Sequence, residues 1–512
     1  MPARSAPPFD RAVAAIAGIT FLAHMAVSGR HGFFRDELYF IDCGRHPALG
    51  YVDQPPLVPL VAAATQAFGH SLVLLRTIPA ASHAAAAIVT AALAKLVARE
   101  AGTNGRFAAP AAAAALALSP MMLGLHTTLS TTAFETLAWT FVAYAAARIA
   151  TGGDPRWLTL AGIAVGIDLE IKYAVPLFAA PLLLGFVAGP GRRALFTREA
   201  LVAGAIAGVL AAPSLVWQWT HGLPFRDLMR AAANGKNVVV PPLPFLGNQI
   251  MAMNPALAPM WIGGVAWSLA GRGLARVRFL GVGFVAVLAE MILLHGKDYY
   301  VAPAYGVAFA LGAAGMERLV PWRAARALYA VPVAAFAVVG APLAMPILSP
   351  PSLARYMRAI GAAPQAQENN QKGEALPQLQ ADMLGWPELE ASVAAVWRTL
   401  SDDERAHTAI VASNYGEAGA LNFFGPRDGL PRAVSGHNSY FVWGPGGSDP
   451  AVILRLNGKV ESWKDDCAEA RIAGRFGDSE YVMPYEHDRP ILLCRGAKIS
   501  LSAEWGSFKH VD

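Results

Sequence analysis

The chain has little charge and few cysteines, and each shortage excludes a class of protein. Its 512 residues include only three cysteines, too few for a small domain held together by several disulfides. Charged residues make up 15% of the chain, against about 25% in ordinary soluble domains. Hydrophobic residues make up 55%, and the mean hydropathy is +0.38. This composition argues against a soluble enzyme or a disordered chain and predicts a polytopic membrane protein.

Nucleic-acid binding is not expected either, because the basic residues do not cluster. The formal net charge is +5, but the arginines and lysines stand singly between apolar runs. A nucleic-acid-binding surface needs a basic patch or stripe. We therefore predict no nucleic-acid partner.

Acidic residues are scarce in the first two thirds of the chain. Fifteen of the 36 Asp and Glu residues lie in residues 1–349, and 21 lie in the much shorter segment 350–512. No apolar run of about 20 residues, the length that crosses a bilayer, occurs after Met345. We therefore predict a transmembrane domain over residues 1–349 and a soluble C-terminal domain over residues 350–512.

Hydropathy predicts about eleven membrane spans in the first domain. They are residues 11–28, 72–97, 107–125, 131–150, 157–170, 173–188, 200–217, 253–270, 279–294, 300–316 and 324–345. The first span is also short and Ala-rich enough to be a cleaved signal peptide, but the loop after it would then lose its anchor. Arginines gather in the even-numbered turns, which places those turns in the cytoplasm. The C-terminal domain is then extracytoplasmic, and a miscount of one span would reverse that assignment.

The first outward loop, about residues 30–58, contains the most chemically specific sequence. It brings together a cation, two adjacent acids, an aromatic residue and a further acid: Arg35, Asp36, Glu37, Tyr39 and Asp53. Charged groups beside hydrocarbon are costly and usually functional. An acidic pair at such a place is otherwise a solvated loop. The neighbouring groups, and a rigid Pro-Pro turn that fixes the direction of Asp53, favour a site.

Four further outward turns carry polar residues. They contain His126 and Glu135, then Glu170 and Lys172, then Lys236, and finally Lys297, Asp298 and Tyr299. Each has a structural alternative, such as a helix cap, an ion pair between Glu170 and Lys172, or a lysine against lipid headgroups. Aromatic belts explain Tyr299, but not the charged pair before it. Because all these turns share one face, we predict a site at the boundary of water and lipid.

Such a site suits a lipid-linked phosphate substrate. Cations bind and neutralise a phosphate, and a carboxylate accepts a proton from an incoming hydroxyl. A departing polyprenyl phosphate is already an anion, so it needs stabilisation by Lys or Arg more than it needs a proton. The sequence contains no Gly-x-x-x-x-Gly-Lys-Ser/Thr phosphate loop for a nucleotide. The expected partners are a polyprenyl-phosphate sugar donor, membrane lipids and a cell-envelope acceptor.

Three segments resemble bacterial family 39 glycosyltransferases, relatives of protein O-mannosyltransferases and of the aminoarabinose transferase that acts on lipid A. The segments are Arg35-Asp-Glu-Leu-Tyr, Tyr51-Val-Asp-Gln-Pro-Pro-Leu and His295-Gly-Lys-Asp-Tyr-Tyr-Val-Ala-Pro-Ala-Tyr. The resemblance covers most of residues 30–310. Segments 413–420 and 435–440 also look like the C-terminal part of such bacterial members.

The resemblance implies the helical bundle of C-type glycosyltransferases, and it implies roles for particular residues. An acid in the first outward loop is the family's catalytic base, which assigns this role to Asp36, with Glu37 in support. Lys172, Lys236 and Lys297 become the candidates for binding the donor phosphate. Protein mannosylation is not implied, because the chain has no large central-loop insertion like that of the eukaryotic enzymes.

The C-terminal segment mixes helical and strand patterns, which predicts an α/β domain. Strands are expected at residues 408–413, 451–456 and 491–494. Polar and aromatic residues beside its loops either bind sugar or acceptor or fill turns and core: Asn414, Tyr415, Glu417, His437, Asn438 and Tyr440. Cys467 and Cys494 pair if the domain lies in an oxidising compartment, and their spacing alone does not decide this.

The sequence thus predicts an inverting glycosyltransferase on the outer face of a bacterial inner membrane. The alternative is a membrane transporter or flippase, a class that tends to show internal repeats and charged residues at mid-membrane. The chain shows no convincing repeat, and its polar residues lie at span ends. A non-catalytic receptor would leave Asp36, Glu37 and Lys297 unexplained.

The predicted chemistry requires no cofactor. No metal site is predicted, because His126, His221 and His295 lack the spacing of zinc ligands. A His–carboxylate metal site assembled by folding stays open as an alternative.

Overall fold

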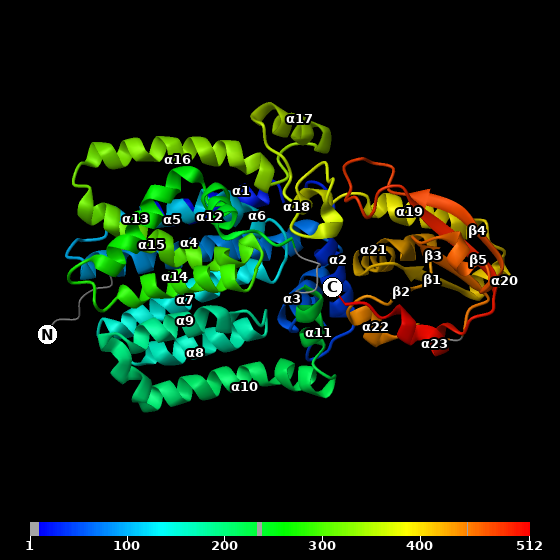
Figure 1. Ribbon diagram of the computed structural model, residues 1–512, viewed down its shortest axis with the longest axis horizontal. Coiled ribbons are helices and arrows are strands. Elements are labelled where there is room, and N and C mark those ends of the chain that lie inside the picture. Colours follow the sequence, from blue (N-terminus) through cyan, green and yellow to red (C-terminus); the bar gives the residue numbers. More distant parts are fainter. Residues whose placement is uncertain (1–9, 233–237, 448, 512) are drawn as a thin grey trace. The chain divides into compact units, whose positions relative to one another are not determined.

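The computed structural model describes residues 10–232, 238–447 and 449–511, and it separates into two compact units (Figure 1). The first unit comprises residues 1–28, 76–212 and 239–345. The second comprises residues 29–75, 213–238 and 346–512. The first outward loop therefore belongs to the same unit as the C-terminal segment, although more than 270 residues separate them in sequence.

The first unit is built from helices. They are α1 (Arg11–Met25), α4 (Leu72–Glu100), α5 (Ala108–Ala117), α6 (Pro120–Leu125), α7 (Thr132–Ala150), α8 (Arg156–Leu169), α9 (Val175–Val187), η1 (Pro190–Phe196), α10 (Arg198–Thr220), α12 (Pro242–Ala252), η3 (Pro255–Leu257), α13 (Ala258–Ala270), α14 (Arg278–Leu293), η4 (Asp298–Ala304), α15 (Tyr305–Leu319) and α16 (Arg323–Ala344). Each of the eleven apolar segments expected from hydropathy overlaps at least one of these helices.

Small residues let the helices at the centre of the first unit approach closely. A Cβ added to Gly264 of α13 would lie 2.3 Å from the Cα of Gly312 in α15. Packing through glycine and alanine is typical of membrane helices, where association depends on close contact rather than on the hydrophobic effect.

Among the described residues, three helices are long and apolar enough to cross a membrane, namely α4, α10 and α16. A fourth is α9 with η1, if this pair, bent by 114°, forms one broken span. Only 17% of the apolar window is buried in α10 and in α16, so most of their apolar surface needs lipid around it. The remaining expected spans are shorter or interrupted helices.

The second unit combines helices with one sheet. Its elements are α2 (Arg35–Arg45), α3 (Leu57–Gln66), α11 (Pro224–Ala231), α17 (Pro350–Ile360), η5 (Asn369–Gln371), α18 (Gln378–Ala381), α19 (Trp386–Arg398), α20 (Asp402–Ala406), β1 (Thr408–Ala412), α21 (Tyr415–Phe424), η6 (Gly425–Asp428), β2 (Ala433–Ser435), α22 (Ser439–Trp443), β3 (Val452–Leu456), η7 (Val460–Trp463), β4 (Cys467–Phe476), β5 (Arg489–Ala497), α23 (Leu501–Glu504) and η8 (Trp505–Phe508).

The five strands form a mixed sheet in the order β2-β1-β3-β5-β4. The strands β2, β1 and β3 run parallel, while β5 runs antiparallel to both β3 and β4. In this register Ile410 pairs with Ala433 on one side and Leu454 on the other. Helix α21 packs against β1 and β2, and α19 packs against β4. Three of the strands, β1, β3 and β5, overlap the segments expected to be strands.

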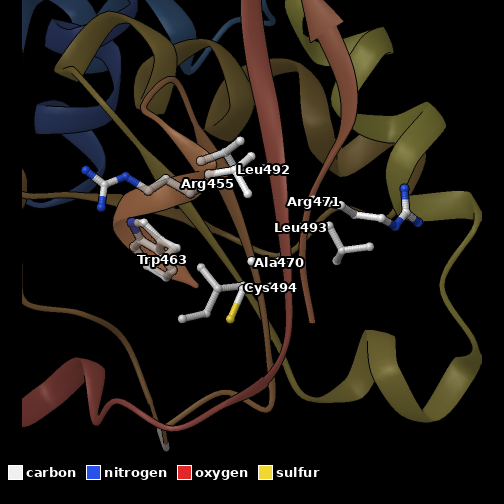
Figure 2. Close-up of a pocket in the computed structure, with 9 residues that line it drawn as sticks. Arg455, Trp463, Ala470, Arg471, Leu492, Leu493 and Cys494 are labelled. Carbon is white, nitrogen blue, oxygen red and sulfur yellow. The ribbon is translucent and has the colours of Figure 1, made fainter. Parts of the chain in front are cut away.

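Cys467 of β4 and Cys494 of β5 form a disulfide. A cavity of about 10 Å³ lies beside Cys494 and Trp463, on the sheet side of η7 (Figure 2). Figure 2 shows Arg455 and Arg471 extending away from it in opposite directions. Because that volume is about the least that holds one water molecule, the cavity is a packing feature of the sheet and not a binding site.

Candidate functional site

Helix α2 carries the expected catalytic acids in its first turn. Two negative charges there are favourable because they face the positive end of the helix dipole. The backbone N–H of Phe34 donates a hydrogen bond of 2.8 Å to Oε2 of Glu37, whose side chain is fully buried. Glu37 therefore caps the helix, and its carboxylate fixes the position of Asp36 beside it.

Two glycines of α21 allow this helix to lie directly against α2. A Cβ added to Gly416 would lie 2.5 Å from Cγ of Arg35, and one added to Gly419 would lie 3.1 Å from the backbone carbon of Leu38. The approach brings the first residue of α21 to the acid, since Oη of Tyr415 donates a hydrogen bond of 2.8 Å to Oδ1 of Asp36.

A second tyrosine and a buried carboxylate hold Arg35 on the other side. Nη1 of Arg35 donates to Oη of Tyr485 at 2.7 Å, and that hydroxyl donates to Oδ1 of Asp382 at 2.7 Å. Nε of Arg35 lies 3.7 Å from Oδ1 of Asp36, and its guanidinium carbon lies 4.8 Å from the centre of the Tyr415 ring. The side chain of Asp36 keeps 32% of its surface exposed, against 0% for Asp382. Asp36 is thus the accessible carboxylate of this cluster.

Burial controls the protonation of the groups around Asp36. It raises the pKa of Tyr415 well above its ordinary value, and the Asp36 charge adds to this rise against the opposing effect of Arg35. Burial also raises the pKa of Asp382, although Arg35 and the hydrogen bond from Tyr485 act in the other direction. Tyr415 therefore remains a hydrogen-bond donor to Asp36 at neutral pH.

The same face of α2 holds a second tyrosine–acid pair. Oη of Tyr39 donates a hydrogen bond of 2.7 Å to Oδ1 of Asp53 and lies 2.8 Å from Oγ of Ser439. The ring of Tyr39 stacks obliquely on Tyr415, with 4.9 Å between centroids. The structure thus brings together Arg35, Asp36, Tyr39 and Asp53 in the second unit, as the loop sequence predicts.

Two of the expected cations, Lys172 and Lys297, lie in the first unit. Nζ of Lys172 lies 2.9 Å from Oε2 of Glu135, donates to Oγ1 of Thr132 at 3.1 Å and lies 5.0 Å above the ring of Tyr300. Lys172 therefore pairs with Glu135, whereas the sequence suggested Glu170 as its partner. Glu170 is half-buried at the end of α8.

The turn before α15 contains two half-buried residues, Lys297 and Tyr299, and one buried acid, Asp298. Lys297 precedes η4 and is half-buried, and Tyr299 packs edge-on against Tyr300. Asp298 is buried and accepts a hydrogen bond of 2.6 Å from Nδ2 of Asn248 in α12. Because Tyr300 also covers Lys172, this turn and the end of α8 lie together in the first unit.

Two expected binding residues do not join these clusters. His126 is fully buried and stacks on His83 at 4.4 Å, while His83 lies within hydrogen-bond distance of His24. Lys236 lies outside the described residues. In the described ranges no group of three or more His, Cys, Asp or Glu side chains is arranged to hold a metal ion.

Comparison with known proteins supports a common fold and family. Residues 53–217 match the family model of dolichyl-phosphate-mannose-protein mannosyltransferases. The fold matches ArnT from Cupriavidus metallidurans in the apo state, with a TM-score of 0.60 and 12% identity. ArnT bound to undecaprenyl phosphate matches with a TM-score of 0.56, and both alignments cover 94% of this chain and 97% of ArnT. Residues 53–217 thus carry the sequence pattern of this family, and the chain has the fold of the C-type glycosyltransferases.

The chain also shares its fold with the Archaeoglobus fulgidus oligosaccharyltransferase in complex with Zn and sulfate. That structure has a TM-score of 0.50 and 14% identity, and the alignment covers 83% of this chain and 62% of the other. No match is found among curated proteins. These matches agree with the family and the enzyme class predicted from the sequence.

Sequence reasoning missed two residues of the Asp36 cluster, Asp382 and Tyr485. Neither lies in a motif, and Asp382 is 347 residues from the arginine that it faces. Tyr415 carried a signal, because it stands in a segment resembling the family, but its contact with Asp36 depends on the packing of α21 against α2. Only the fold reveals that partnership.

Proposed function

We propose that this glycosyltransferase moves one sugar from a polyprenyl-phosphate donor to a hydroxyl group of a cell-envelope acceptor, with inversion at the anomeric carbon. The proposed location is the outer face of a bacterial inner membrane, with about eleven spans and an extracytoplasmic domain over residues 350–512. The relative bound to undecaprenyl phosphate supports the donor class. The disulfide between Cys467 and Cys494 supports an oxidising compartment for the C-terminal domain.

The observation that carries this proposal is the partly exposed carboxylate of Asp36, held by Tyr415 and flanked by Arg35. Tyr415 engages Oδ1, which leaves Oδ2 to accept the proton of the acceptor hydroxyl. As that proton moves to Asp36, the hydroxyl oxygen forms a bond to the anomeric carbon and the bond from that carbon to the phosphate oxygen breaks. The polyprenyl phosphate departs with the electron pair, and single displacement inverts the anomeric centre.

The departing phosphate needs positive charge near it. Lys172 and Lys297 are the candidates in the first unit, with Lys236 as a third. Lys172 is held by the buried Glu135, so its ammonium has a fixed position before the donor binds. Fixed charges of this kind stabilise a developing anion without the cost of reorganisation.

Asp36→Asn tests the proposal in purified, reconstituted protein supplied with lipid-linked sugars. The amide keeps the shape of the side chain and removes the base, so we expect transfer to fall by about 10²–10⁴-fold. Asp402→Asn, at an exposed position of α20, is the matched control and keeps full transfer. Full activity of Asp36→Asn would remove Asp36 from the role of base.

A further inference from the structure

A polar cavity lies at the end of α2 opposite to Asp36. Its volume is about 230 Å³, and its polar lining consists of Asp42, Arg45, His46, Asn422 and Arg432. Apolar residues of α21 and the following loop complete the wall. Since a helix rises 1.5 Å per residue, these α2 residues lie about 9–15 Å along the axis from Asp36.

The floor of this cavity is a buried, fully held carboxylate. Asp42 is 2% exposed, and its Oδ2 accepts hydrogen bonds from Oη of Tyr440 at 2.6 Å and from Nδ2 of Asn422 at 2.8 Å. Arg432 approaches the same oxygen at 3.6 Å, and Arg45 approaches Oδ1 at 3.9 Å. One carboxylate therefore faces two guanidinium groups, which leaves a net positive charge.

Contacts hold both guanidinium groups in place and still leave some of their N–H donors available to a ligand. The guanidinium of Arg432 lies 5.6 Å above the ring of Trp443, and His46 stacks on the same ring at 4.3 Å. Nδ1 of His46 lies 2.9 Å from the carbonyl oxygen of Asp42, and its Nε2 faces Nη1 of Arg432. Arg45 donates to the carbonyl of Asn422 at 2.9 Å.

The charge and the geometry of the arginines define the ligand. Each guanidinium has five N–H donors in a planar fork, which matches the oxygens of a carboxylate or a phosphate. The side chains of Arg45 and Arg432 remain 38% and 46% exposed, so an incoming group can reach them. The volume is below that of pockets for whole drug-sized ligands, about 300–1,000 Å³, and suits one anionic group.

We propose that this cavity binds a carboxylate or phosphate group of the acceptor. The acceptor is then an acidic glycan or glycolipid, anchored at Arg45 and Arg432 while one of its hydroxyl groups reaches Asp36. This assignment of the substrate class rests on the proposed function, whereas the anion site itself does not.

Binding of small probes to the full-length protein in neutral detergent tests the site directly. Glucuronate and glucose 6-phosphate should bind saturably in calorimetry, more weakly at high salt, whereas glucose should not bind. Arg432→Gln should lower the affinity for both anions by about tenfold or more. Arg475→Gln, which alters an exposed arginine paired with Asp488, is the control and should bind like the wild type.

Arg432→Lys keeps the charge but removes the fork, so we expect an intermediate affinity and an unchanged thermal unfolding curve. Equal binding of glucose, or unchanged anion affinity in Arg432→Gln, would overturn the proposal. Vesicles containing phosphatidylglycerol distinguish a headgroup from an acceptor. If Arg432→Gln loses only vesicle binding and the sugar anions do not bind, the site serves lipid headgroups and the acceptor assignment is wrong.

Transfer assays separate this proposal from the role of Asp36. Arg432→Gln should raise the KM for an acidic acceptor by about tenfold while kcat changes little, because the group acts on binding alone. Asp36→Asn should lose transfer yet bind glucuronate with wild-type affinity. Full transfer by Asp36→Asn would overturn the proposed base, but it would leave the anion site standing.

Discussion

The two units of the chain hold their charged residues in different ways. In the second unit, Asp36 is positioned by tyrosines and by a helix contact that only glycine permits. In the first unit, Lys172 is positioned by one buried carboxylate and one aromatic face. The base is therefore held by contacts from several distant parts of the chain, and the cation mainly by Glu135 and Thr132 of one helix, α7. We infer that single substitutions at Lys172 lower the free energy of unfolding more, whereas substitutions around Asp36 mainly lower the rate of transfer.

The largest expected effect is that of Lys172→Met. It leaves Glu135, which is 1% exposed, without its cation. An uncompensated buried charge costs about 3–5 kcal/mol of unfolding free energy, which chemical denaturation in detergent would measure. The double variant Lys172→Met with Glu135→Gln should recover most of that stability but not the affinity for the lipid donor. Recovery of both would show that Lys172 serves structure alone.

The disulfide gives the next largest effect, and it separates stability from catalysis within the second unit. Replacing Cys467 and Cys494 by serine removes a cross-link that closes a loop over a sequence separation of 27. We expect a loss of about 2–4 kcal/mol in unfolding free energy and an unchanged kcat below the melting transition. The double variant should match either single variant in stability. A large fall in kcat would mean that the sheet positions Asp36 more directly than the hydrogen bonds indicate.

Tyr415→Phe should act on catalysis with little effect on stability. It removes the hydrogen bond to Asp36 but keeps the ring beneath Arg35. A hydrogen bond to a charged group contributes about 1.5–3 kcal/mol, so we expect kcat to fall by about tenfold or more. Tyr481→Phe, at a surface position, should leave kcat unchanged.

The sequence predicted the family, the enzyme class and the residues of the acid cluster around Asp36. It did not predict the residues that hold this cluster in place. Asp36 and its neighbours lie close together in sequence, so a short motif identifies them. Asp382 and Tyr485 are distant from that motif, and only the packing of α2 against the C-terminal segment assigns them a role. For His126 the sequence predicted a binding residue in an outward turn. In the structure His126 is buried and stacks on His83.

The smallest expected effect concerns Glu374, which lies in the second unit. Burial raises the pKa of this carboxyl from 4.5 to about 7, and the neighbouring Asp382 adds to the rise. The folded chain therefore keeps the proton up to about pH 7, whereas the unfolded chain releases it near pH 4.5. Stability should fall as pH rises between these two values and level off above them, because the unfolded state gains by ionising first. Since the side chain is only partly buried, solvent screening keeps the effect small.

Glu374→Gln removes this titration and should flatten the stability profile between pH 4.5 and 7. The comparison variant Glu388→Gln changes a carboxylate elsewhere in the same unit and should keep the slope. Ionised Glu374 also adds negative charge near Asp382, the partner of Arg35, so kcat of the wild type should respond slightly near pH 7. If Glu374→Gln and the wild type give superimposable pH profiles of stability and rate, Glu374 is ionised over this whole pH range in the folded chain. Asp382, which supports Arg35, then tolerates a second negative charge near it.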